Sequence, residues 1–144
     1  MGESDLVGTW RLVSLETRSS DGASTRPFGS DPSGVLAYDS AGNFSVQLAR
    51  SGRPHFASGD IQDGADDEIR GAYTGYVAYF GAYDVNEAQG YIIHNVDVSL
   101  FPNWEGIQQQ RFFALYEDTL TLTTPPMPFG GREVRGALVW ERAS

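Results

Sequence analysis

The sequence has 144 residues, the length of one average domain, and its 40% hydrophobic and 20% charged residues are typical of a globular protein. It contains no cysteine and no lysine, which excludes disulfides, zinc–thiolate sites, cysteine nucleophiles and Schiff-base lysines. The formal net charge of -9 opposes a polyanionic partner, and the arginines are scattered, so we expect no nucleic-acid binding.

Membrane and export signals are not found in these residues. No apolar run approaches the roughly 20 residues needed to cross a bilayer. The first residues, Met1–Asp5, lack the basic and apolar regions of a signal peptide. We therefore expect a single domain over residues 1–144, located in the cytoplasm and without a membrane partner.

Short segments rich in β-branched and aromatic residues alternate with turn residues, a pattern typical of antiparallel strands. The first predicted strand covers residues 7–16, and a loop rich in Gly, Ser, Asp and Pro follows at 19–34. Three hairpins and a last strand are predicted next: 35–38 with 44–49, 83–85 with 91–99, 107–116 with 119–124, and 134–141. Gly42 lies in the turn of the first hairpin, where it can supply a positive φ.

One segment follows a helical period instead. Its apolar residues recur at positions 69, 73, 76, 77 and 80, which predicts one short helix over about 66–80. The acidic residues 66–68 then occupy its first turn, where carboxylates complement the helix dipole and the free N–H groups. We prefer this interpretation to a cation site, because three consecutive carboxylates at a helix start do not converge on one ion.

The order of these elements favours an all-β fold. Strands joined by hairpin-length links form an antiparallel meander, which closes most economically into an up-and-down barrel without open edges. The expected fold is an up-and-down antiparallel β-barrel of about 8–9 strands with one short helix. A barrel of this size is just wide enough to hold one small ligand.

Several motifs resemble a known family. They are Gly8-Thr9-Trp10, Pro27-Phe28-Gly29, LARSGRP at 48–54, GYVAYFGAY at 75–83, SLFPNW at 99–104 and LTLTTPP at 120–126. The first is similar to the Gly-x-Trp signature of lipocalins and related calycin barrels. The whole string spans nearly the entire chain and resembles the small bacterial and fungal lipocalin-like domain family.

This resemblance implies a lipocalin-like barrel in which Trp10 packs at the closed end under an arginine from a late strand, either Arg135 or Arg142. Similar small barrels include passive carriers and enzymes that cyclise or isomerise apolar substrates, so the fold alone does not choose a function. Genes of the family often lie near secondary-metabolite or oxidoreductase genes, which implies a role in secondary metabolism.

The strand predicted over 107–116 carries the main candidate site. Gln109, Arg111, Phe113 and Leu115 share one of its faces. If that face points inward, the barrel has an apolar base and a polar upper half, suited to an amphipathic ligand with a carboxylate, enolate or carbonyl group. The alternative is that Arg111 is an ordinary surface or salt-bridged arginine.

His94 and the tyrosines offer further polar groups. His94 lies on an apolar strand face, either as a general base or ligand donor, or as a core histidine bonded to its neighbours. Tyr76 and Tyr83 belong to a tyrosine cluster that either caps the barrel mouth or packs in the core. We predict no metal site, since His94 and His55 lack ligand spacing and would have to converge with a carboxylate.

These features favour binding of a small hydrophobic or amphipathic molecule in the barrel, in secondary metabolism. The predicted ligand-binding residues are Gln109, Arg111, Phe113, His94 and Tyr83. The alternative is a cofactor-free cyclase or isomerase acting on a polyketide- or terpene-like substrate. Its catalytic candidates are His94, Arg111 and Tyr76, and no cofactor is expected for either function.

The apolar, proline-rich loop at 124–131 has two interpretations. It is either a lid over the barrel or the contact of a homodimer. A third function class follows from the second interpretation, an interaction module that uses residues 125–129.

Overall fold

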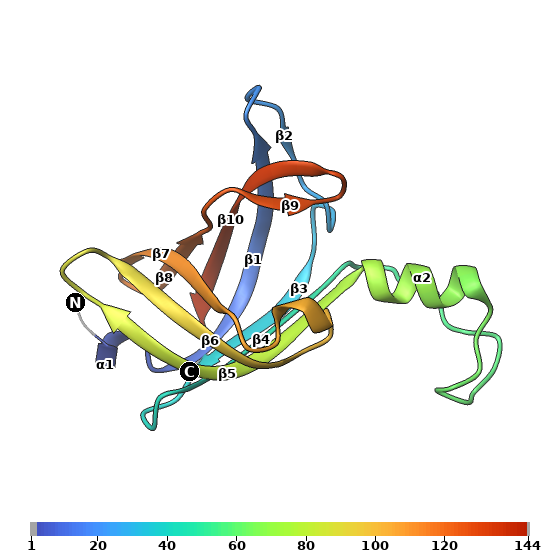
Figure 1. Cartoon of the computed structure of the whole chain (residues 1–144), viewed down its shortest axis with the longest axis horizontal. Coiled ribbons are helices and arrows are strands. Elements are labelled where there is room, and N and C mark those ends of the chain that lie inside the picture. Colours follow the sequence, from blue (N-terminus) through green and yellow to red (C-terminus); the bar gives the residue numbers. More distant parts are fainter. Residues whose placement is uncertain (1–2, 144) are drawn as a thin grey trace.

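The structure, a computed structural model, describes residues 3–143. Its elements are α1 (Glu3–Leu6), β1 (Gly8–Ser19), β2 (Ser24–Thr25), β3 (Ser33–Tyr38), β4 (Asn43–Ala49), α2 (Asp66–Thr74), β5 (Tyr76–Asn86), β6 (Tyr91–Ser99), η1 (Pro102–Trp104), β7 (Gln108–Tyr116), β8 (Thr119–Thr123), β9 (Met127–Phe129) and β10 (Arg132–Arg142). Strands dominate the described chain, as the sequence predicts (Figure 1).

Eight of the strands form a closed antiparallel barrel (Figure 1). The meander runs β1, β3, β4, β5, β6, β7, β8 and β10, and β10 pairs back onto β1 along its length. The two extra strands are short, with β2 paired to β1 and β9 paired to β10. The prediction of an up-and-down antiparallel barrel is therefore confirmed.

The β3–β4 hairpin illustrates why the strands form where they do. On β4, Phe44, Val46 and Leu48 are buried while the residues between them are more exposed, the alternation of a half-buried strand. The turn before β4 is held by Asp39, whose carboxylate accepts backbone N–H groups from residues 41 and 43 at 3.0 and 2.8 Å. Gly42 supplies the positive φ, 91°, that the sequence predicts for this turn.

One end of the barrel is closed by Trp10. Its side chain is fully buried, and its Nε1 donates a hydrogen bond of 3.0 Å to the carbonyl of Leu6 in α1. The guanidinium of Arg142 lies 4.3 Å from the Trp10 ring centroid and donates to the carbonyls of Val7 and Asp5 at 3.0 and 2.6 Å. The arginine implied by the family resemblance is thus Arg142 rather than Arg135.

The predicted helix at 66–80 is too long. α2 ends at Thr74, and residues 76–80 are the first residues of β5. There the chain pairs with β4, for example Tyr79 opposite Val46, and the inward side chains alternate with outward ones. The aromatic and β-branched side chains of this segment favour a strand, and pairing with β4 outweighs their helix-like spacing.

α2 itself lies outside the barrel, beyond the start of β5 (Figure 1). None of its residues is buried, and the apolar Ile69 and Tyr73 remain 50% and 43% exposed. Its acidic first turn acts as a helix start, because the Glu68 carboxylate accepts the backbone N–H groups of Ala65 and Ala57, each at 2.9 Å. None of the helices within residues 3–143 is long and apolar enough to cross a bilayer.

β1 and β10 extend beyond the barrel at the end opposite Trp10. β1 continues to Ser19, past its predicted end at 16, and the loop predicted at 124–131 contains β9. β2 and β9 flank this extension, because they pair with β1 at Thr17 and Arg18 and with β10 at residues 132–134. The extension forms one wall of the open end of the barrel.

Candidate functional site

A cavity of about 490 Å³ lies at the open end, and we call it the mouth cavity. Its volume falls in the range of roughly 300–1,000 Å³ that is usual for small-molecule sites. Its aromatic lining residues are Phe28, Tyr73, Tyr76, Phe101, Trp104 and Phe129. Most of these belong to loops and to the ends of elements, so the mouth cavity is built by the connections rather than by the middle of the barrel.

A second cavity of about 70 Å³ lies deeper in the barrel, and we call it the inner cavity. Four side chains line both cavities: Phe28, Val77, Trp104 and Phe129. The two spaces therefore adjoin at these four residues. The inner cavity also has four polar residues in its lining: Thr17, Tyr79, Arg111 and Thr124.

Aromatic contacts hold the boundary between the two cavities. The rings of Phe28, which follows β2, and Phe129, at the end of β9, lie 6.4 Å apart and join the two flanks of the β1–β10 extension. The guanidinium of Arg50 lies 5.6 Å from the Phe28 ring centroid. On the opposite side, Trp104 of η1 meets Tyr79 edge to face, with ring centroids 5.4 Å apart.

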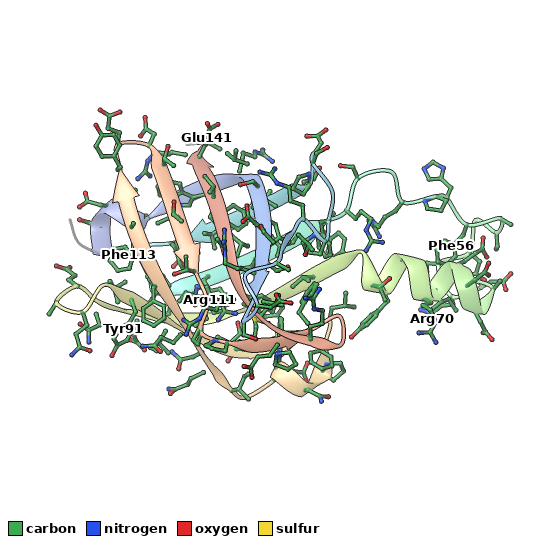
Figure 2. The ribbon with its side chains drawn as sticks, turned by 90° about the horizontal axis from the view of Figure 1, so that it is seen from above. Phe56, Arg70, Tyr91, Arg111, Phe113 and Glu141 are labelled. Carbon is green, nitrogen blue, oxygen red and sulfur yellow. The ribbon has the colours of Figure 1, made fainter. Side chains whose placement is uncertain are left out.

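β7 turns its predicted face inward. Gln109 and Arg111 are buried, and Phe113 and Leu115 pack against the core, whereas residues 108, 112 and 116 are exposed. Figure 2 shows Arg111 near the middle of the barrel and Phe113 nearer to α1, the closed end. Because this face of β7 points inward, the barrel has a polar upper half and an apolar base.

Arg111 is held by neutral acceptors. One terminal nitrogen donates 2.9 Å to Oε1 of Gln109, and the other donates 3.0 Å to the backbone carbonyl of Gln110. Within residues 3–143, the ion pairs of arginines involve Arg18, Arg132 and Arg142, and none involves Arg111. The structure thus favours the lumen interpretation of Arg111 over a surface or salt-bridged arginine.

His94 is part of the barrel core. It is 1% exposed, its ring stacks on Phe44 with centroids 4.2 Å apart, and its Nε2 shares a hydrogen bond of 2.7 Å with the Tyr38 hydroxyl. Its Nδ1 is buried without a partner among the described residues. Burial, with a smaller effect from the Arg111 charge, holds the pKa of His94 well below its usual value, so the ring is neutral.

The lipocalin-like domain family model matches residues 7–143. The chain belongs to the lipocalin-like domain family. A relative is the 4'-hydroxy-3'-methoxypropiophenone carrier protein ppsC of Aspergillus oryzae, which is 32% identical over 105 residues. The match covers 68% of this chain and 95% of that protein.

In this lipocalin-like barrel the other predicted site residues are spread over its length. Tyr76 lines the mouth cavity, where its hydroxyl bonds to Gln47 and its ring lies 4.9 Å from the guanidinium carbon of Arg53. Tyr83 is buried, and its hydroxyl donates 2.7 Å to the carbonyl of Asp39. Neither cavity lining includes His94, Tyr83 or Phe113.

Sequence reasoning missed the residues that shape the two cavities of this lipocalin-like barrel. Phe28 and Phe129 lie in segments predicted as loops, and Trp104 lies between the strands predicted at 91–99 and 107–116, so periodicity gives no direction for these side chains. The available signal was the family resemblance, because Pro27-Phe28-Gly29 and SLFPNW are two of the motifs that carry it. Residues 128–130 of the 124–131 loop also line the mouth cavity.

Proposed function

We propose that this protein binds a small aromatic or amphipathic molecule at the open end of its barrel, as a carrier in secondary metabolism. The observation that carries the proposal is the mouth cavity, about 490 Å³ in volume and walled by aromatic side chains. Such walls bury the apolar surface of a ligand and stack on aromatic rings.

The carrier relative from Aspergillus oryzae supports the ligand class. That protein is named for a propiophenone with one hydroxyl and one methoxy group, an aryl ketone of a single ring. A compact aromatic body with polar substituents matches the lining of the two cavities, aromatic in the mouth and partly polar at Arg111 and the hydroxyls of the inner cavity. Arg111, oriented by Gln109, is the polar anchor that we propose for the ligand.

The cyclase or isomerase alternative has less support. Of its catalytic candidates, His94 bonds to Tyr38 and lines neither cavity, and the Tyr76 hydroxyl already donates to Gln47. A general base has to reach the proton that it removes, directly or through one water. His94 lies outside both cavities, the proton of the Tyr76 hydroxyl is bound to Gln47, and Arg111, although it lines the inner cavity, is a permanent cation and does not accept a proton. These are the reasons to propose binding without turnover.

The test is calorimetric titration with the substituted propiophenone that the relative's name gives. Val77→Trp places a large ring at the boundary of the two cavities, and we expect it to weaken binding by about tenfold or more. Phe80→Trp is the matched control, because Phe80 lies on the same strand but is 50% exposed and belongs to neither cavity.

Two results would contradict this proposal. Equal affinity of the two variants, with both folded by circular dichroism, would place the ligand elsewhere on the protein. The second result would be conversion of the propiophenone during incubation, detected by chromatography. A carrier returns the propiophenone unchanged, whereas an enzyme converts it to an isomer or a cyclised product.

A further inference from the structure

Among residues 4–143, Arg111 is the one charged residue whose side chain is buried. It is 8% exposed, while the other buried polar side chains, such as Gln109 and Thr124, carry no charge at neutral pH. A buried cation is costly unless an opposite charge and hydrogen bonds compensate for the lost hydration. The charge of Arg111 therefore needs a compensating group.

Among the residues that the structure describes, no carboxylate forms an ion pair with Arg111. Its two hydrogen-bond partners are an amide oxygen and a backbone carbonyl, from Gln109 and Gln110. Burial raises the pKa of Tyr38 well above its usual value, so this nearby phenol stays neutral and does not act as a counter-ion. Because a guanidinium has five N–H donors and these bonds use two of them, donors remain for a further acceptor.

The position of Arg111 makes it accessible to a ligand. It lines the inner cavity together with the hydroxyl-bearing Thr17, Tyr79 and Thr124. The Thr124 hydroxyl accepts the backbone N–H of Gly136 at 2.8 Å, which leaves its own proton available to donate. At about 70 Å³ the inner cavity has room for a head group, and the adjoining mouth cavity, at about 490 Å³, has room for the rest of a molecule.

We propose that the ligand is an amphipathic organic anion, whose negative group enters the inner cavity and pairs with Arg111 while its aromatic body fills the mouth cavity. This inference rests on the function proposed above and specifies the ligand class for that site. A guanidinium pairs with a planar carboxylate or with an ionised phenol or enol by charge-assisted hydrogen bonds, which are about twice as strong as neutral ones. A neutral ligand leaves the buried charge unbalanced, and a cationic ligand is repelled by it.

Two fluorescent probes test this inference, because they share one apolar skeleton and differ in charge. Anilinonaphthalenesulfonate is an anion, and N-phenylnaphthylamine is the same skeleton without the sulfonate. We expect the wild-type protein at moderate salt to bind the anionic probe at least about tenfold more tightly than the neutral one. In Arg111→Met, which keeps the volume of the stem but not the charge, the anionic preference is expected to disappear.

Arg132→Met is the control for the overall loss of one positive charge. Arg132 lies on the same end of the barrel, but it is exposed, pairs with Asp21 at 3.7 Å and lines neither the mouth nor the inner cavity. It should keep the preference of the wild-type protein for the anion. If Arg111→Met does not fold, Arg111→Gln replaces it. The ratio of the dissociation constants of the two probes in Arg111→Gln is then compared with the ratio in the wild-type protein.

The outcomes separate this inference from the proposed function. Neutral-probe binding that is as tight as anionic-probe binding would overturn the anion class and leave small-molecule binding intact. An anionic preference that survives in Arg111→Met would place the anion away from Arg111 and also overturn the inference. If neither probe binds, the proposed function fails together with the inference.

Discussion

Replacing Trp10 with alanine should destabilise the protein strongly. The side chain is fully buried, its Nε1 donates to Leu6, and the Arg142 guanidinium lies 4.3 Å from its ring centroid. Truncating a buried tryptophan costs about 3–5 kcal/mol, because the backbone does not refill the cavity. Since the mutation also leaves the Leu6 carbonyl without its donor, we expect a loss of about 4 kcal/mol in the free energy of unfolding.

That loss corresponds to a drop of about 15 °C in the melting temperature of a domain of this size. Thermal unfolding followed by far-ultraviolet circular dichroism measures it without relying on tryptophan emission. Trp104→Ala is the matched comparison, because Trp104 is only partly buried and lines both cavities, so its loss should weaken ligand binding more than stability. A Trp10→Ala protein that melts within a few degrees of the wild type would refute the closing role, most clearly if it had also lost ligand binding.

The remaining predictions concern pH and backbone packing. Burial lowers the pKa of His94 below 6.5, so below that pH the unfolded chain binds the extra proton, and the free energy of unfolding should fall by about 1.4 kcal/mol per pH unit. Denaturant titrations between pH 7 and 5 should show this slope in His55→Leu and lose it in His94→Leu. Gly81→Ala should cost at least about 2 kcal/mol, since its Cβ would lie 2.0 Å from the carbonyl oxygen of Asn95, whereas Gly136→Ala, with its nearest atom at 3.4 Å, should cost under about 1 kcal/mol in the same assay.

The hairpins were predictable from sequence because residues close together in the chain determine them. Alternating apolar residues define each strand, and a turn such as the one containing Asp39 and Gly42 fixes where two strands meet. Closure of the barrel followed from the number of strands and the short links between them. Neither inference requires knowledge of contacts between distant parts of the chain.

The errors arose where distant pairing decides the structure. Residues 76–80 have both helix-like spacing and strand-forming side chains, and their pairing with β4 selects the strand. β9 becomes a strand only because it lies beside β10, since its sequence, Met-Pro-Phe, has no alternation to recognise. The contact of Tyr38 with His94 joins residues 56 positions apart in the chain, and strand periodicity alone does not identify such a partner.

The candidate site was predictable only in part. Periodicity placed Gln109 and Arg111 on one face of β7, but it did not decide whether that face points inward. The closed barrel decides it, because the opposite face of β7 carries the exposed Phe112 and Tyr116. The mouth cavity also depends on loops and on the ends of elements, so four of its aromatic lining residues had no predicted direction: Phe28, Phe101, Trp104 and Phe129.

Arg142 and Arg111 differ in what offsets their charge, Arg142 at the closed end of the barrel and Arg111 near its middle. Arg142 is only partly exposed, but its charge is offset by the carbonyls of Val7 and Asp5 at the end of α1 and by the Asp118 carboxylate at 3.5 Å. Carbonyls at a helix C-terminus carry partial negative charge, so this guanidinium is compensated within the fold. Arg111 is more deeply buried and has neutral partners, so a bound anion would add the compensation that the fold supplies to Arg142. The charge of Arg142 is therefore balanced within the fold, whereas the anion that we propose as ligand would balance the charge of Arg111 beside the inner cavity.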